Sequence, residues 1–287
     1  MSDFVLREAP SETSPRVKPQ PKSGSSAIPV PFEYTPSDDG TDENLLILLH
    51  GLGDTHAPFA KLGRQLKLPQ TATLALRAPE QIPLLYEQAF QWYTSFDPLG
   101  ELIDRPNPTP ALELLSKVVK HLTEDCKWPP QRIHFFGFSQ GGTVAAEFGL
   151  KWWKEEWGKR VRWEKERDTQ QTKGSQNTEP EYTPRTLGSI VTVSGPLISY
   201  PTLTQPCTTP LFLVHRPAPS PEALPSSAIA AFKKGYGHFV EVKLSARGQG
   251  MPSGKEEMEP VMKFWSERLS RRQVEGLYEV VSGAAPI

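Results

Sequence analysis

A serine between glycines is the feature of this sequence with the clearest capacity for chemistry. Gly137-Phe138-Ser139-Gln140-Gly141-Gly142 follows an apolar run at 132–136 and precedes a helical pattern at 143–148. Glycines permit a turn too sharp for residues with a Cβ, and a strand-to-helix turn of this kind holds the serine hydroxyl above the sheet edge. The pattern predicts that Ser139 is a nucleophile for a carbonyl carbon. The simpler interpretation is a glycine-rich turn with a solvated serine.

A second glycine-containing loop follows the first apolar run of the chain. His50-Gly51-Leu52-Gly53-Asp54-Thr55 comes directly after residues 45–49, which are all aliphatic. In α/β-hydrolases this loop and the residue after the nucleophile each supply a backbone N–H to the oxyanion. The N–H groups of Leu52 and Gln140 are the predicted donors, and one such donor stabilises a transition state by about 2.7–4 kcal/mol. A plain turn with a capping Asp54 is the alternative.

These two motifs, in this order, resemble those of the acyl-protein thioesterase, phospholipase and carboxylesterase family of α/β-hydrolases. The resemblance covers residues 45–272 without 151–186, and three further segments share it: 92–97, 210–215 and 248–269. It implies an α/β-hydrolase fold, with a mostly parallel sheet between helices. It also implies hydrolysis of long-chain esters or thioesters, in acylated proteins or lipids, with neither a metal nor an organic cofactor.

The sequence departs from this family at the two other catalytic positions. The family's catalytic residues occur in the order Ser, Asp, His, and its aspartate lies just beyond the sixth strand. Pro219 stands at that position here, and Met251 stands at the position of the histidine. Asp168 is the only aspartate after Ser139, and no histidine follows His238. The usual base and its orienting carboxylate are therefore absent from their usual positions.

A serine hydroxyl without an adjacent base is a weak nucleophile. In a well-studied serine protease, loss of the catalytic residues leaves only about 10³–10⁴-fold catalysis over water. Four residues are candidate substitutes for the base or for the group that orients it: His56, Glu222, Glu256 and Glu257. His56 follows the first glycine loop, and the three glutamates follow the positions of the lost aspartate and histidine. For each of them, a structural role at the start of a helix is the alternative.

Apolar runs and helical stripes alternate along the chain between these motifs. The sequence predicts strands at 45–50, 72–76, 132–138, 190–194, 211–215 and 239–244, with an edge strand in 28–34. It predicts helices at 60–68, 110–126, 140–165, 221–234 and 255–272. Strands that alternate with helices indicate a parallel sheet covered on both faces. Ligands of such sheets bind at the carboxyl ends of the strands, where Ser139 lies.

Three stretches stand outside this alternation. Residues 1–27 are rich in Pro, Ser, Lys and Glu, so we expect a disordered tail before a hydrolase domain at 28–275. Residues 276–287 form a second tail. Residues 151–186 form a charged insertion with four tryptophans, whose apolar stripe favours packing of a continued helix on the domain. A transient membrane contact through this aromatic and basic stretch is the alternative.

Composition excludes several classes of function. The formal net charge is −1, so the sequence offers no electrostatic basis for binding nucleic acid. The only two cysteines, Cys126 and Cys207, form no disulfide framework and fit a reducing compartment. No signal-peptide pattern and no apolar run of about 20 residues occurs. We expect a cytoplasmic protein without a transmembrane segment.

The sequence therefore supports two functions from different classes. The first is a serine hydrolase of the acyl-protein thioesterase type, with Ser139 as nucleophile and a non-standard base. The second is a catalytically silent hydrolase-like protein that binds an acyl ligand or a protein partner. Turnover that disappears in Ser139→Ala would favour the first, and bound lipid without turnover would favour the second.

Overall fold

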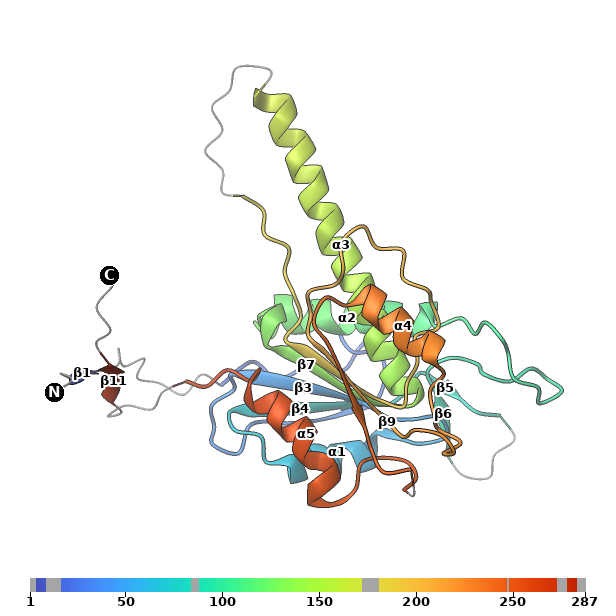
Figure 1. The fold of residues 1–287 in the computed structure, drawn as a ribbon. Coiled ribbons are helices and arrows are strands. Elements are labelled where there is room, and N and C mark those ends of the chain that lie inside the picture. Colours follow the sequence, from blue (N-terminus) through green and yellow to red (C-terminus); the bar gives the residue numbers. More distant parts are fainter. Residues whose placement is uncertain are drawn as a thin grey trace.

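A single large sheet forms the centre of the protein (Figure 1). The computed structural model describes residues 4–8, 17–83, 88–171, 181–246, 248–272 and 278–282. The order of the sheet is β10-β9-β8-β7-β3-β4-β2. Its strands are β2 (Phe32–Thr35), β3 (Asn44–Leu49), β4 (Thr71–Leu76), β7 (Ile133–Phe138), β8 (Ser189–Val193), β9 (Leu211–His215) and β10 (Phe239–Lys243). All neighbouring strands are parallel except the edge strand β2, which pairs antiparallel with β4.

Helices cover both faces of the sheet (Figure 1). They are α1 (His56–Leu66), α2 (Thr109–Glu124), α3 (Gln140–Gln171), α4 (Ser226–Gly235) and α5 (Gly254–Ser266), and a short 3₁₀ turn, η1 (Pro130–Arg132), precedes β7. Helices α1 and α5 lie on one face, and α2, α3 and α4 lie on the other. The predicted mostly parallel sheet between two helical layers is confirmed.

The central strand β3 shows why polar and apolar residues do not alternate along the apolar runs of the sequence. Leu45, Ile47 and Leu49 pack in the core beneath α2, α3 and α4, while Leu46 and Leu48 pack in the core beneath α1 and α5. All five side chains are fully buried. Successive strand residues point to opposite faces, so a sheet covered twice needs apolar residues at every position. Because the strands are held by this burial, the two glycine loops begin at fixed positions at the ends of β3 and β7.

A short hairpin forms a separate two-stranded sheet beside the first glycine loop, and the sequence did not predict it. Its strands β5 (Glu80–Gln81) and β6 (Phe90–Gln91) pair antiparallel. The Gly53 N–H donates to the Phe90 carbonyl over 2.9 Å, which ties the hairpin to the loop. Strands of two residues are too short to leave a periodic pattern. Residues 84–87 of the connection lie outside the described part of the chain.

The expected boundary of the N-terminal tail is wrong. Pro21 and Ala27 are buried. The Lys22 N–H donates to His121 Nε2 over 3.0 Å, and Lys18 Nζ donates to the Lys127 carbonyl over 2.9 Å. Backbone hydrogen bonds and two buried side chains order residues 17–27 against the end of α2, which composition alone did not indicate. Within the two predicted tails, β1 (Phe4–Glu8) pairs antiparallel with β11 (Tyr278–Ser282), and residues 1–3, 9–16, 276–277 and 283–287 lie outside the described ranges.

The predicted insertion is largely an extension of α3. This helix continues to Gln171, past the predicted end near 165. Trp153 is buried, as the predicted apolar stripe requires, and Glu156 is 1% exposed. The Glu156 carboxylate accepts hydrogen bonds from Arg185 and from the Tyr182 hydroxyl, which fastens the returning chain to the helix. Residues 172–180 of the predicted loop lie outside the described part of the chain.

Candidate active site

The serine loop has the geometry of a tight strand-to-helix elbow. Ser139 has a φ of 50°, in the left-handed region that side chains other than glycine rarely occupy. Its N–H donates to the Val193 carbonyl over 2.8 Å, so β8 holds the turn in place. A Cβ on Gly137 would lie 2.3 Å from the Gly141 carbonyl carbon. The turn therefore requires the glycines that surround the serine.

The first glycine loop packs directly against this elbow. A Cβ on Gly141 would lie 2.3 Å from the Leu49 carbonyl oxygen and 2.5 Å from that of His50. A Cβ on Gly51 would lie 2.8 Å from the Phe138 ring and 3.5 Å from Ser139 Cβ. Side chains larger than hydrogen at these two positions would push the loops apart. Glycines thus bring the two predicted halves of the site into contact.

The two predicted oxyanion donors lie on these touching segments. Gln140 is the first residue of α3, where backbone N–H groups have no acceptor within the helix. Leu52 is 37% exposed, and its N–H donates to no backbone carbonyl among the described residues. The Ser139 side chain is half-buried and makes no hydrogen bond in the same part of the chain. The donor roles of Leu52 and Gln140 stay predictions, on segments that the fold brings together.

The Gln140 side chain has a second role that the sequence reasoning missed. It is buried, and its Oε1 accepts the Trp92 N–H over 2.9 Å. Its Nε2 donates to the Tyr93 carbonyl over 3.0 Å and to Ser95 Oγ over 2.7 Å. Residues 92–95 are therefore attached to the elbow itself. A long amide directly after the nucleophile was the available signal, but only the fold shows what it binds.

His50 is fixed as a neutral imidazole that shapes the first glycine loop. Its Nδ1 donates to the Gly51 carbonyl over 2.7 Å, because its Nε2 accepts the Ala78 N–H over 2.9 Å. Burial lowers the pKa of His50, which keeps the ring uncharged. The Trp92 indole N–H donates to the His50 carbonyl over 2.8 Å. With both ring nitrogens in use, His50 orders the loop and is not free to act as a base.

Three further histidines are also bound to neighbouring residues. His134 Nδ1 lies 2.8 Å from Ser189 Oγ, and burial lowers the pKa of His134 to about 3. His215 Nε2 lies 3.0 Å from Glu241 Oε1 on the adjacent strand. His121 Nδ1 lies 2.7 Å from Asp125 Oδ2 at the end of α2. None of these contacts involves the serine elbow, so these histidines serve the scaffold.

His56 forms no hydrogen bond with the serine elbow in the described residues, so the structure gives no support for its predicted role as a base. His56 is the first residue of α1, and no hydrogen bond joins its ring to Ser139 in the described residues. Burial and the charge of Arg77 lower the pKa of His56, and Glu33 is its acidic neighbour. Arg77 follows β4 and Glu33 belongs to β2, whereas Ser139 follows β7 on the other side of β3. His56 therefore lies on the flank of the first glycine loop.

An ion pair stands in the corner where the family pattern expects an aspartate and a histidine. Arg216 directly follows β9 and is 1% exposed. Its Nη1 and Nη2 donate to Glu257 Oε1 and Oε2 over 2.8 and 3.0 Å. Nη1 also donates to the Ser245 carbonyl after β10. A Cβ on Gly248 would lie 2.4 Å from the same guanidinium, so this glycine makes room for it.

This ion pair weighs against Glu257 as the replacement for the base. Hydrogen bonds from Arg216 and from the Ser253 N–H lower the pKa of Glu257 to about 2. A carboxylate stabilised in this way is a poor proton acceptor at neutral pH. Glu256 is exposed in the first turn of α5, in the structural position that was the alternative. Both residues belong to the helix start.

Glu222 is the candidate that the structure leaves available. Its Oε1 accepts the Gly250 N–H over 2.7 Å, which attaches the loop after β9 to the residue before Met251. Its Oε2 is buried and has no hydrogen-bond donor among the described residues. Met251 packs at the edge of the core beneath α1 and α5, and Pro219 is exposed. Glu222 thus touches the loop of the missing histidine and, unlike Glu257, keeps one carboxylate oxygen without a donor in the described residues.

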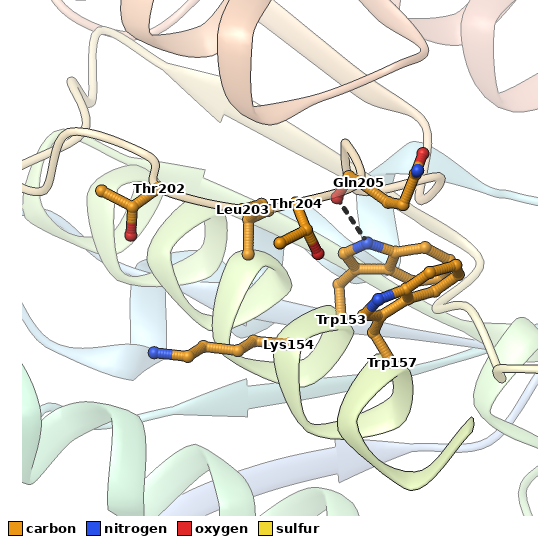
Figure 2. Close-up of a pocket in the computed structure, with 7 residues that line it drawn as sticks. All are labelled: Trp153, Lys154, Trp157, Thr202, Leu203, Thr204 and Gln205. Atoms are coloured by element: carbon orange, nitrogen blue, oxygen red, sulfur yellow. Dashed lines mark hydrogen bonds between the residues drawn. The ribbon is translucent and has the colours of Figure 1, made fainter. Parts of the chain in front are cut away.

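A separate pocket lies along α3 and contains no residue of the elbow (Figure 2). It encloses about 110 Å³ between the helix and the segment 202–205. The Trp153 indole donates to the Gln205 carbonyl over 2.9 Å, and its ring lies 5.9 Å from that of Trp157 (Figure 2). This contact attaches the segment to α3 and leaves a shallow gap beside the two rings.

No group of three or more His, Cys, Asp or Glu side chains in the described ranges could hold a metal ion. Among the helices of those ranges, none has the length and apolar character that crossing a bilayer requires.

Comparisons with known proteins agree with this architecture. The sequence pattern of the phospholipase/carboxylesterase family matches residues 33–157. An uncharacterized hydrolase of Mycosarcoma maydis is 34% identical over 245 residues, covering 84% of this chain and 82% of the relative. The structure of esterase PE8 aligns with a TM-score of 0.63 and 18% identity, over 84% of this chain and 99% of its own.

Acyl-protein thioesterase 2 of Zea mays is a further structural relative. It aligns with a TM-score of 0.55 and 20% identity, over 84% of this chain and 100% of its own. At such identities the solved structures establish the fold, which is that of α/β-hydrolases. The match to the Mycosarcoma protein covers a larger share of the chain than the family pattern does.

Proposed function

The chain belongs to the phospholipase/carboxylesterase family of α/β-hydrolases, and we propose that it hydrolyses carboxylic esters or thioesters with Ser139 as the nucleophile. The observation that carries this proposal is the elbow: a serine at a φ of 50° between glycines that admit the first glycine loop. Strained backbone of this kind costs energy and gathers at functional sites. Acylated proteins and lipid esters are the proposed substrate class.

In the proposed reaction, Ser139 Oγ attacks the carbonyl carbon of the substrate and loses its proton. The N–H groups of Leu52 and Gln140 bind the oxygen that becomes negative, and the alcohol or thiol leaves with a proton. Water then attacks the acyl-enzyme and releases the carboxylic acid, which restores the Ser139 hydroxyl. The proton passes to a carboxylate through water, and Glu222 is the residue to which we assign this role.

The assignment of Glu222 rests on its unpaired oxygen. Glu222 Oε2 is buried without a donor, whereas both oxygens of Glu257 are bound. A carboxylate is a weaker base than the imidazole it replaces. We therefore expect slow turnover, with the oxyanion donors and substrate binding as the main source of catalysis.

A fluorophosphonate probe tests the nucleophile. We expect the wild type to label slowly and Ser139→Ala not to label, with turnover of a medium-chain thioester falling below that of the wild type to the residual level left by the oxyanion donors and substrate binding. Ser194→Ala is the matched control, because Ser194 also has a left-handed φ, of 53°, at the end of the neighbouring strand β8. Labelling that survives in Ser139→Ala, or that is absent from folded wild type, would contradict the proposal.

A specific observation favours a second function, that of a silent acyl-binding protein. The corner that normally supplies the base is filled by the Arg216–Glu257 pair, and Met251 packs on the core. This function predicts equal turnover in wild type and Ser139→Ala. It also predicts an acyl molecule that co-purifies with the protein. Mass spectrometry of an organic extract of the native protein checks this, with Ser139→Ala processed in parallel to separate binding from hydrolysis.

A further inference from the structure

Arg77 stands out among the basic residues near the candidate site because no ion pair neutralises it within the described part of the chain. It directly follows β4, and its guanidinium carbon lies 4.1 Å from the centre of the Phe90 ring. Its Nε is buried without an acceptor, and no carboxylate in the described ranges forms an ion pair with it. Arg77 is half-buried, and a flat cation held on an aromatic ring is a common arrangement for recognising an anion.

His56 lies beside this cation and, like Arg77, has a ring or guanidinium nitrogen without a hydrogen-bond partner in the described residues. Arg77 stacks on Phe90, whose backbone is hydrogen-bonded to Gly53 and Asp54, and His56 follows two residues later at the start of α1. The positive charge of Arg77 also lowers the pKa of His56, after the larger effect of burial. The Nδ1 of His56 is buried and has no hydrogen-bond partner in the described residues. An unpaired buried polar atom costs about 1–3 kcal/mol. Two such nitrogens on neighbouring side chains indicate a site that a ligand completes.

The acidic residues of this region are already bound elsewhere. The carboxylate of Glu33, the acidic neighbour of His56, forms an ion pair with Arg64 on α1. The Asp54 Oδ1 accepts the Thr55 N–H over 2.7 Å. The first turn of α1, which begins at His56, contains no acidic residue. Neither Glu33 nor Asp54 forms an ion pair with Arg77 in the described residues.

Hydrogen bonds connect this cationic corner to the first glycine loop. Phe90, which carries Arg77 on its ring, accepts the Gly53 N–H and donates its own N–H to the Asp54 carbonyl. The same loop contains Leu52, the predicted oxyanion donor. A ligand that reaches from the serine elbow across this loop arrives at Arg77 and His56.

We propose that Arg77 and His56 form a subsite for a carboxylate carried by the substrate, beside the oxyanion loop. A carboxylate offers two oxygens to the fork of the guanidinium and accepts an N–H from the imidazole. The preferred substrates are then esters or thioesters that carry a free carboxylate at the other end. This substrate preference rests on the proposed function, whereas the binding of the carboxylate does not.

Binding to the Ser139→Ala protein tests the subsite without interference from turnover. The probes are monomethyl succinate, which carries one carboxylate, and dimethyl succinate, which carries none. We expect calorimetric titration to show at least about 10-fold tighter binding of the monomethyl ester, as charge-assisted hydrogen bonds predict, and a loss of this preference as salt rises. Inorganic phosphate, titrated separately, distinguishes a general anion site from one shaped for a carboxylate: binding as tight as that of the monomethyl ester would overturn the carboxylate assignment.

Arg77→Met in the same background should make the two probes bind equally, while Arg64→Met should leave the preference unchanged, because Arg64 is a paired arginine on the same flank. If Arg77→Met fails to fold, Arg77→Lys and His56→Gln each should reduce the preference by at least about threefold. Equal binding of both probes to the Ser139→Ala protein, or an equal loss in Arg64→Met, would overturn the subsite. A selective subsite in a protein without turnover would instead reject only the proposed hydrolysis.

Discussion

The serine elbow and the acid–base corner lie at the same edge of the sheet but are built in opposite ways. The acid–base corner is the region between the loop after β9 and the start of α5. At the elbow, backbone approaches backbone: Gly141 touches the Leu49 carbonyl at a distance that no side chain would permit. At the corner, two charged side chains, Arg216 and Glu257, connect the loop after β9 to the start of α5. The first region retains the pattern of the family, and the second has replaced it.

This difference shows that the two halves of a hydrolase site are structurally independent. The elbow depends on glycines and on the strands β7 and β8, none of which contacts the Arg216 side chain in the described hydrogen bonds. A base and its orienting acid, in contrast, lie on loops that a buried ion pair can hold equally well. The nucleophile side can therefore persist when the base is lost.

Restoring the aspartate and the histidine of the family pattern would remove the contrast between the two regions. In Pro219→Asp/Met251→His we expect kcat for a thioester to rise by about 10²–10⁴-fold, the usual contribution of a positioned general base. Each single variant should gain far less, because an unoriented histidine and an aspartate without a histidine do not act alone. Steady-state rates of the three variants, with Ser139→Ala added to each, check this. No gain in a folded double variant would mean that the elbow is not competent.

Breaking the ion pair measures how much the corner stabilises the fold. Arg216→Met should lower the free energy of unfolding by about 3 kcal/mol, because it leaves the Glu257 carboxylate partly buried without its cation. The double variant Arg216→Met/Glu257→Leu should recover most of that loss. Urea unfolding of the three proteins provides the comparison. Equal stability of wild type and Arg216→Met would show that the pair is dispensable.

Acid should weaken the same corner. The folded-state pKa of Glu257 is about 2, below its ordinary value of 4.5. Its contribution to stability is therefore complete above about pH 5 and disappears as the pH falls toward 2, because protons then bind the unfolded state more strongly. Thermal unfolding from pH 7 to pH 3 should show a smaller drop in Glu257→Gln than in wild type. Parallel curves for the two proteins would contradict this.

At the elbow, the Gln140 side chain should contribute less than the ion pair. Gln140→Leu removes three hydrogen bonds and leaves buried polar groups at Trp92 and Tyr93, so we expect a loss of about 2 kcal/mol. Ser95→Ala removes only one of these bonds and should cost about 1 kcal/mol. Chemical denaturation distinguishes the two. If the glutamine variant costs no more than the serine variant, the amide is not what holds residues 92–95.

The smallest expected effect is a gain in stability. Ser139→Gly relieves a left-handed φ of 50°, so it should stabilise the protein by about 1 kcal/mol while it removes the nucleophile. Ser139→Ala keeps the unfavourable conformation and should not stabilise. Differential scanning calorimetry of both variants checks this difference. An equal response would show that the elbow stores no strain.

Much of the fold follows from local patterns. Leu211–His215 forms a strand at the predicted residues, since five apolar or strand-forming residues in a row fit a sheet buried on both faces. The start of α4 was predicted at Pro221 but lies at Ser226, because Pro225 holds an extended conformation before the helix. The end of α5 at Ser266, rather than 272, likewise depends on a local detail that periodicity does not record.

The candidate site was predicted unevenly for the same reason. Ser139, Leu52 and Gln140 could be named because glycine spacing reports backbone geometry that is local in sequence. The partners of Glu222 and Glu257 are Gly250 and Arg216, which lie 28 and 41 residues away along the chain. Contacts over such separations depend on which strands are neighbours, and no short pattern contains that information.

The sequence by itself determined the strands, the helices and the two glycine loops, because each follows from the preferences of adjacent residues for a backbone conformation and for burial. Only the tertiary structure decided that Arg216 binds Glu257, that the Gln140 amide fastens residues 92–95, and that Arg77 stays unpaired beside the first glycine loop. These contacts join loops from different strands, and their energies depend on distance and burial, which exist only after the sheet has assembled.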